Sequence, residues 1–307
     1  MMERLKNESG FALILTLVVT ALMVAVVVEM IHQVYVDTSL SRGFRDGQQA
    51  SILAESGATG GAKLLQMGLS GRTYTSLSDR WATPLKLEDE AGSLEITISE
   101  ESSKININGL VQQNQDDDPF TLAALKRLGT RLKLTADVWG AVADWIDSND
   151  IPHAGGAESS YYRALKPPYS ARNGKLMTLT ELSLVKGFTP EILGKLSPYL
   201  TIYSDSLLPR VNINTAPKEV LAALDKGIDD RMAERIMAER SLQPFKSVGE
   251  LSRVPGLQTI ATGLGGWITV QGNIFRITSV AKVKESGRTV EAVVRMPGGE
   301  FLSWQEY

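Results

Sequence analysis

The sequence predicts an α+β protein in which a long N-terminal helix packs on a small antiparallel sheet, with a large all-helical region inserted into that sheet. Three observations lead to this expectation. An uncharged apolar run lies near the N-terminus, segments with strand-like alternation occur both early and late, and the sequence between them has helical character. The chain has 307 residues, which is enough for two or three domains with a real core.

Composition excludes several classes of function. The 32 basic and 35 acidic residues nearly balance, so the chain has no global field that would attract a polyanion. Cysteine is absent, which excludes disulfides and thiolate metal sites. With only two histidines, His32 and His153, a histidine-based cluster would need nearly the whole supply. Nothing in the sequence completes a hydrolase site or a Ser–His–Asp triad, so we expect no enzyme activity.

The first expected element is a membrane-spanning segment. Residues 1–10 are short and polar, and no formal charge occurs from Phe11 to Val28. A helix of about 18 residues spans roughly 27 Å, close to the hydrocarbon thickness of a bilayer. Arg4 and Lys6 precede the span, which predicts a cytoplasmic N-terminus and a single pass, with the bulk of the chain across the membrane.

The junction before this span allows three interpretations. Residues 29–37, EMIHQVYVD, offer no small-x-small cleavage site, which argues against an ordinary secretory signal. A plain signal anchor remains open. The stretch SGFALIL at 9–15 resembles the type IV prepilin signal, in which the apolar helix stays in the mature protein. That resemblance implies that a prepilin peptidase cuts between Gly10 and Phe11 and that Phe11 becomes an N-methylated amino terminus.

Leu15 departs from the pattern of that signal. Pilins of this family usually carry glutamate at the fifth mature position, which is Leu15 here. Their carboxylate is thought to neutralise the amino terminus of a neighbouring subunit, because an unpaired charge among apolar helices is costly. A subunit without it suits a filament tip, where one neighbour is missing. The departure therefore favours a specialised minor subunit over a major pilin.

The apolar helix is expected to continue well past the membrane. A loose apolar face predicts one helix over 11–67, roughly 85 Å long. Small residues gather at 54–62. Each glycine there weakens a free helix by up to about 1 kcal/mol but lets another backbone approach closely. Half of the helix would then lie in the membrane and half against a periplasmic domain.

Strand-like segments at both ends of the remaining chain predict the sheet. SLEITIS at 93–99 and KININ at 104–108 read as one hairpin around the turn EESS, and 273–283 with 289–296 read as a second around KESGR. The expected divisions are a cleaved leader at 1–10, the helix at 11–67 with its span at 11–28, the first part of the sheet at 68–109, helical subdomains at 110–208 and 209–267, and closing strands at 268–307.

The helical insertion contains internal echoes. KININGL at 104–110 resembles VNINTAP at 211–217, and the segments 179–196 and 248–257 are also alike. Thr189 followed by proline, and the run before KEVLAAL at 218–224, read as helix starts. We therefore expect two small helical subdomains built on related plans.

These echoes also resemble helix-hairpin-helix modules, which bind the DNA backbone through amides at helix N-termini. Only Lys186 and Arg253 lie near the two turns, with Glu181 and Glu250 close by. Binding through phosphates needs several cations together. We therefore predict a structural, sterile-alpha-motif-like use of the modules and no nucleic-acid partner, with a DNA-uptake receptor as the alternative.

An acidic segment forms the one candidate metal site. Asp144, Asp147 and Asp150 are spaced three apart, and Glu158 follows a glycine-rich turn. Calcium takes six to eight oxygen ligands, so such carboxylates together with loop carbonyls could hold it. A solvated acidic helix end is the competing interpretation. A second acidic run at 116–118 precedes Pro119 and is expected to be a solvated linker entering a helix, whose N-terminus favours negative charge.

Four stretches together give a resemblance over nearly the whole chain. They are the junction with Leu15, ADWIDSNDIPHAGGAESSYY at 143–162, RVNINTAPKEVLAAL at 210–224, and FLSW at 301–304. The chain resembles the general secretion pathway protein K family, the minor pseudopilins of type II secretion.

The resemblance carries specific implications. It implies a type IV pilin-like core with the inserted helical domain, anchored in the bacterial inner membrane. It implies a place at the pseudopilus tip beside two other minor pseudopilins, where the subunit primes or caps a filament that serves protein export and has no catalytic chemistry. Members of the family have been associated with calcium. A minor pilin of a type IV pilus remains the other interpretation.

Overall fold

A computed structural model describes residues 5–90, 92–134, 137–204 and 210–307. The α-helices are α1 (Leu5–Leu69), α2 (Pro119–Arg131), α3 (Trp139–Ile146), α4 (Ser159–Arg163), α5 (Pro190–Leu196), α6 (Lys218–Leu224), α7 (Asp230–Leu242) and α8 (Gln258–Leu264). The strands are β1 (Leu85–Asp89), β2 (Gly92–Glu100), β3 (Ile105–Asn106), β4 (Leu200–Thr201), β5 (Val211–Asn212), β6 (Ile268–Thr269), β7 (Ile274–Val283), β8 (Ser286–Arg295) and β9 (Glu300–Glu306). Short 3-10 turns are η1 (Arg80–Ala82), η2 (Glu101–Ser103), η3 (Ile107–Gly109), η4 (Leu179–Leu184), η5 (Ser197–Tyr199) and η6 (Val248–Arg253).

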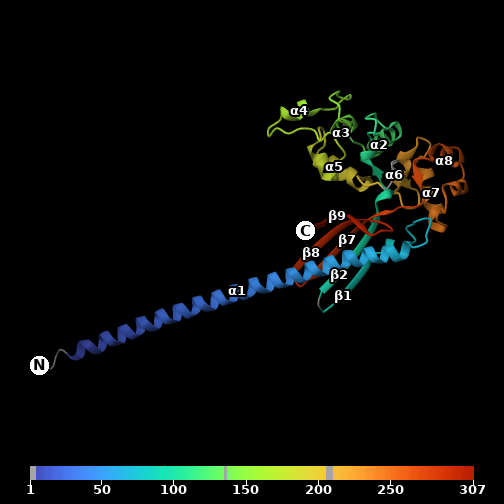
Figure 1. The fold of residues 1–307 in the computed structure, drawn as a ribbon. Coiled ribbons are helices and arrows are strands. Elements are labelled where there is room, and N and C mark those ends of the chain that lie inside the picture. Colours follow the sequence, from blue (N-terminus) through green and yellow to red (C-terminus); the bar gives the residue numbers. More distant parts are fainter. Residues whose placement is uncertain (1–4, 91, 135–136, 205–209) are drawn as a thin grey trace.

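Helix α1 is a single rod of 65 residues, and its first half projects away from the rest of the molecule (Figure 1). It is slightly longer than the predicted helix at 11–67, because it already begins at Leu5 and ends only ahead of Gly71, whose φ is 72°. Residues 10–45 are exposed, and within the described chain α1 is the helix that is long and apolar enough to cross a membrane.

The second half of α1 lies across one face of a five-stranded antiparallel sheet with the strand order β1-β2-β7-β8-β9. Strand β2 pairs with β7, so everything between them leaves the sheet and returns to it. The core of this layer joins small residues of α1 to apolar side chains of the strands: Ala54, Ala58, Leu94, Ile96 and Ile277. The predicted α+β fold with a helical insertion is confirmed.

Two glycines explain how closely α1 approaches the sheet. A Cβ added at Gly57 would overlap the hydroxyl of Ser279 and lie 2.8 Å from Cδ1 of Leu94. A Cβ added at Gly61 would lie 3.0 Å from Cγ2 of Ile277. The small residues predicted to admit another backbone therefore do so against strands of the same chain.

One predicted hairpin is wrong. Residues 93–99 lie in β2, which pairs with β1 and β7, and not with residues 104–108. The turn η2 directs the chain out of the sheet after Glu100, and Ile105–Asn106 forms β3, which pairs in parallel with β4. The alternation in KININ thus belongs to a separate two-stranded sheet. Strands β1 and β9 were not anticipated, whereas the closing hairpin of β7 and β8 is confirmed.

The inserted region has the predicted internal repeat. In each half an asparagine accepts a hydrogen bond from the amide two residues later, Asn106 from Asn108 and Asn212 from Asn214, both at 2.9 Å. The side chain of the second asparagine of each pair both donates a hydrogen bond to, and accepts one from, the backbone of a residue far away in the sequence. Asn108 does so with Leu176, and Asn214 does so with Phe245. Parallel pairs β3–β4 and β5–β6 complete the two halves, which share one core.

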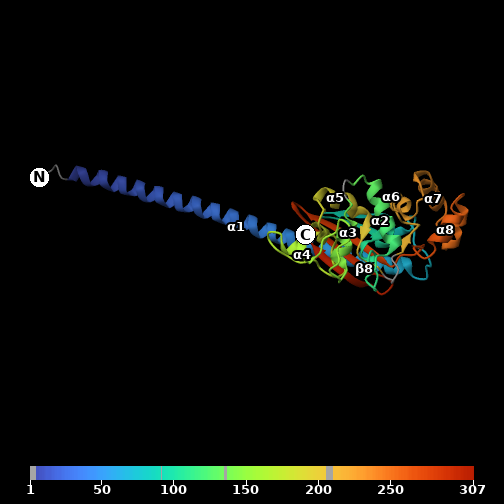
Figure 2. The same cartoon turned by 90° about the horizontal axis from the view of Figure 1, so that it is seen from above.

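The predicted helix starts in this region also hold. The Thr189 side chain accepts a hydrogen bond from the amide of Ile192 at 3.2 Å and caps α5, and α6 begins at Lys218. The helical region gathers at the end of the molecule away from the N-terminus, as the two perpendicular views show (Figures 1 and 2).

Candidate cation site and membrane anchor

The predicted processing junction lies inside α1. No atom lies within 4 Å of a Cβ built on Gly10, and Phe11 and Leu15 are 69% and 52% exposed. None of these three residues therefore has a packing role within the described chain. Residues 1–4, including Arg4, lie outside the described residues. Cleavage after Gly10 stays a prediction.

The acidic cluster is built where α3 ends. Asp144 faces inward from the last turn of α3, and Asp147 is its C-cap residue. Both residues are 0% exposed. The loop that follows returns over them, and Gly156 packs directly on Asp144, because a Cβ there would lie 2.8 Å from its Cγ atom. Glu158, only 5% exposed, precedes α4.

His153 lies at the centre of this cluster. Its backbone amide donates to Oδ1 of Asp144 at 2.9 Å, and its ring Nδ1 contacts the same oxygen. Nδ1 is 3.8 Å from Oδ2 of Asp147, and Nε2 is 3.4 Å from Oδ2 of Asp117. Ligand atoms of Asp144, Asp147 and His153 all lie within 4.8 Å of one another.

Several buried carboxylate oxygens in this cluster have no hydrogen-bond partner among the described residues. They are Oδ2 of Asp144, both side-chain oxygens of Asp147, both of Glu158 and Oδ1 of Asp117. Buried polar atoms are nearly always paired, so such a group calls for a missing partner. A hard cation that takes many oxygen ligands, such as calcium, could be that partner.

The electrostatics of the cluster agree with this. Burial, followed by the negative charges of Asp144, Asp147 and Asp150, raises the pKa of Glu158 to about 7. Burial and the charge of Asp144 also raise the pKa of Asp147. Burial alone would lower the pKa of His153, but the hydrogen bond to Asp144 and the surrounding carboxylates raise it. The site is therefore short of positive charge.

The structure places the four predicted ligands differently. Asp144 and Asp147 are brought together, Glu158 is buried near enough for their charges to shift its pKa, and Asp150 is exposed. His153, which was not among the predicted ligands, is half-buried in the cluster. Within the acidic run at 116–118, expected to be solvated, Asp118 is buried and caps α2, and Asp117 contacts His153.

The turns that resemble helix-hairpin-helix modules use their cations internally. Lys186 donates to the carbonyl of Gly156 at 2.9 Å, which ties its turn to the acidic cluster. Arg253 donates to the carbonyl of Gln243 at 2.9 Å and lies 4.8 Å from the ring centroid of Phe245. These contacts favour a structural use of the modules.

A long, exposed apolar helix whose second half packs on an antiparallel sheet defines a membrane-anchored, pilin-like subunit. Models of the family described as type II secretion system (T2SS), protein K, match residues 103–205 and 211–271. Type II secretion system protein K of Pectobacterium carotovorum subsp. carotovorum is 30% identical over 68% of this chain and 67% of the relative. The chain belongs to the type II secretion system protein K family, the minor pseudopilins of that system.

Other relatives match over greater length. Type II secretion system protein K of Aeromonas hydrophila is 26% identical over 95% of this chain and 94% of the relative. A chain from the crystal structure of the GspK-GspI-GspJ complex of the enterotoxigenic Escherichia coli type 2 secretion system has the same fold, with a TM-score of 0.71 and 23% identity. The match covers 87% of this chain and 99% of that chain.

Proposed function

We propose that this minor pseudopilin forms the tip of the pseudopilus together with two other minor pseudopilins, and that it primes or caps the filament. The position of the helical insert supports the proposal. It lies at the end of the molecule away from the N-terminus (Figure 1). Subunits anchored by parallel helices stack along the direction of α1, so a subunit above this one would meet the insert.

The anchor supports the same position. The exposed Leu15 cannot supply the carboxylate that would neutralise the amino terminus of a neighbouring subunit, and the tip lacks one such neighbour. We place α1 as a single pass through the bacterial inner membrane, with a cytoplasmic leader cut between Gly10 and Phe11 and the sheet and insert in the periplasm. The solved complex that includes a chain of the same fold pairs two further Gsp proteins with it, which supports the choice of partners.

The acidic cluster serves the tip role as a structural calcium site in this proposal. Asp144, Asp147 and Glu158 would hold the ion, and the bound ion would fix the loop at 148–158 against α3. The buried, unpaired oxygens support this assignment. The proposal assigns the clustered carboxylates to cation binding and gives the chain a structural role.

Labelling of isolated filaments tests the tip position. An antibody raised against the insert is expected to decorate one end of each pseudopilus, and an antibody against the major subunit should decorate the shaft. Co-expression of the full chain with the other two minor pseudopilins in detergent is expected to give a three-protein complex. Decoration along the whole shaft, or a chain that stays monomeric with every partner offered, would contradict the tip assignment.

A further inference from the structure

Two adjacent carboxyl groups sit where the chain leaves the sheet for the insert. Glu100 ends β2 and Glu101 begins η2, and they are 2% and 0% exposed. Each of them forms a hydrogen bond to a different half of the insert. Glu101 accepts a hydrogen bond from Thr201 in β4, and Glu100 accepts one from Nδ2 of Asn212 in β5 at 2.8 Å.

The charge of Glu101 is fully compensated. Nε of Arg276 lies 2.8 Å from Oε1 of Glu101, and Nζ of Lys104 lies 3.0 Å from the same atom. Burial alone would raise the pKa of this carboxyl, but the two cations outweigh burial and lower it. Glu101 is therefore an ionised, paired carboxylate that holds the first half of the insert against the sheet.

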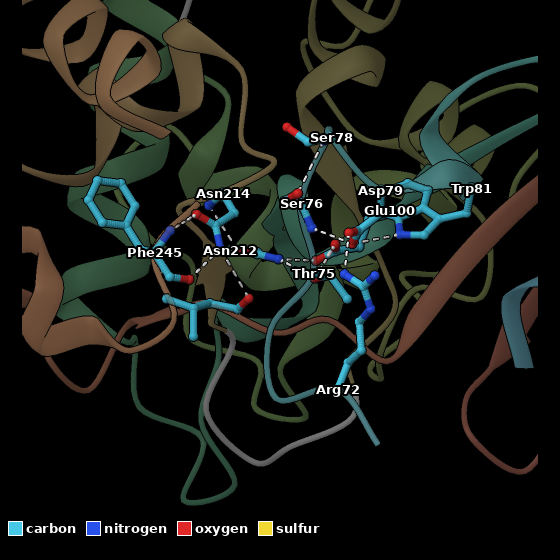
Figure 3. Close-up of polar contacts among 11 residues, drawn as sticks. Arg72, Thr75, Ser76, Ser78, Asp79, Trp81, Glu100, Asn212, Asn214 and Phe245 are labelled. Carbon is cyan, nitrogen blue, oxygen red and sulfur yellow. Dashed lines mark hydrogen bonds and ion pairs between the residues drawn. The ribbon is translucent and has the colours of Figure 1, made fainter. Parts of the chain in front are cut away.

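Glu100 is held only by neutral donors. The hydroxyl of Thr75 donates to its Oε2 at 2.8 Å, and Nδ2 of Asn212 donates to its Oε1 (Figure 3). The hydroxyl of Ser102 also bonds to Oε1, and because a hydroxyl can donate or accept, it can accept the proton of the neutral carboxyl group. Thr75 in turn accepts from Nδ2 of Asn212 at 2.7 Å and from the amide of Gly272 at 3.0 Å. The network thus joins four segments: the loop after α1, the end of β2, the start of the second half of the insert and its return to the sheet.

Charged groups on the surrounding elements are engaged elsewhere. Arg72 in the loop after α1 pairs with Asp79 at 2.6 Å, as Figure 3 shows. On the neighbouring strand and turn, Arg276 and Lys104 pair with Glu101, and Arg276 also pairs with Glu291. Arg240 of α7 donates to backbone carbonyls, and Arg210 before β5 is exposed. Within the described residues no ion pair includes Glu100.

Packing around this carboxyl is tight. A Cβ added at Gly272 would overlap the carboxyl group of Glu100, so only glycine lets the returning chain cover it. Gly272 and Thr75 are both buried. Water therefore has little access to a group that has no cation to stabilise its negative charge.

We propose that Glu100, Thr75, Asn212 and Gly272 form a latch that holds the second half of the insert on the sheet, and that the latch loosens when Glu100 loses its proton. This goes beyond the tip position and the calcium site, because neither involves this joint. Burial raises the pKa of Glu100, against the opposing effect of its hydrogen bonds. A raised pKa makes the folded joint most stable at low pH. That stability is lost as the pH rises through the raised value.

Hydrogen exchange on the full chain in detergent micelles tests the latch. Protection factors, corrected for the intrinsic rate, are measured at pH 5 and pH 8 for peptides covering 211–216 and 268–273. The wild type is expected to lose protection several-fold at pH 8 in these peptides. In Glu100→Gln, which cannot ionise, this loss should disappear.

The matched control is Glu95→Gln, which removes a half-exposed carboxyl of the same strand, paired with Lys86, and leaves the surroundings of Glu100 unchanged. Its peptides at 211–216 and 268–273 should keep the pH dependence of the wild type. Because the chain has no cysteine, spin labels at the exposed Leu242 and Val280 give a second measurement, with a broader distance distribution at pH 8 than at pH 5. Equal protection at both pH values in the wild type, or the same loss in Glu100→Gln, would overturn the proposal.

Discussion

At the residue scale, the unpaired oxygens of Asp144, Asp147 and Glu158 set a definite expectation for calcium. An ion that binds only the folded chain stabilises it by mass action, by about 2.7 kcal/mol at roughly 100 times its dissociation constant. We expect calcium to raise the melting temperature of the wild type by several degrees relative to chelator. Asp147→Asn should weaken calcium binding about tenfold or more and reduce this rise.

Asp150→Asn is the matched control for that measurement. Asp150 belongs to the same acidic segment but is exposed, so its loss should leave most of the calcium-dependent rise intact. A wild-type melting temperature that is the same with calcium and with chelator would show that the cluster is not a calcium site.

Protonation of the same cluster gives a second prediction. The pKa of Glu158 is raised to about 7, so the folded metal-free chain binds a proton more tightly than the unfolded chain does. Its stability therefore falls as the pH rises from about 4.5 to about 7 and is level above that. The raised pKa of His153 acts in the same direction, since a protonated imidazole offsets the carboxylates.

Melting temperatures of chelator-treated protein between pH 5 and pH 8 measure this effect. Carboxylates elsewhere titrate as well, so the quantity to follow is the difference between the wild type and Glu158→Gln. The melting temperature of Glu158→Gln, relative to that of the wild type, should increase as the pH rises. A difference that stays constant, or that changes in the opposite direction, would rule out the raised pKa.

The sequence was enough to find Asp144, Asp147 and Glu158 but not His153 and Asp117. Asp144 and Asp147 lie on one short helix end, where a separation of three places them on neighbouring sides. His153 and Asp117 reach the same point from a loop and from the segment before α2. The path of a loop depends on tertiary contacts such as Gly156 on Asp144, and no local pattern reports them.

At the element scale, substitutions of two glycines in α1 measure the effects of packing and of helix propensity separately. Gly57 faces the sheet, where a Cβ would overlap Ser279, whereas no atom lies within 4 Å of a Cβ on Gly60. Gly57→Ala should destabilise the chain by about 1–3 kcal/mol through overpacking. Gly60→Ala should stabilise it by up to about 1 kcal/mol, because alanine is the better helix former.

Denaturant unfolding of the two variants in detergent compares them on the same helix. Equal effects of the two substitutions would mean that α1 does not approach the sheet as closely as the structure shows. The position of the membrane span makes no difference here, since both glycines lie well beyond residue 28.

The strand pattern shows where element prediction fails. The segment KININ does alternate with a period of two, but its polar side chains bond to nearby backbone, as Asn106 does with Asn108. The alternation therefore does not mark a strand of the main sheet. Nothing local shows that Glu100 and Glu101 turn the chain out of the sheet. Their burial depends on Asn212 and Arg276, which lie far away in the sequence. The closing hairpin was predictable because its turn and both strands are contiguous.

At the scale of the whole molecule, the fold was predictable because its large features are local in sequence. Composition and periodicity are enough to identify the apolar span, the two strand-rich ends and the helical middle. The pairing of β2 with β7 is then the simplest arrangement of these parts. How the insert sits on the sheet was not predictable, because it depends on single buried contacts such as the one between Glu100 and Thr75.

The junction at Gly10 gives the last prediction, because the structure separates its role in processing from any role in folding. Gly10 is exposed on α1 and has no neighbour within 4 Å of a Cβ, so a larger side chain disturbs nothing in the described chain. We expect Gly10→Val to accumulate in the membrane with its leader attached, as measured by intact mass and N-terminal sequencing. Gly43→Val is the control, since Gly43 is also exposed on α1 without neighbours, and it should be processed normally. Recovery of mature Gly10→Val beginning at Phe11 would show that this glycine does not direct the cut. A wild type that keeps residues 1–10 would instead indicate a plain signal anchor.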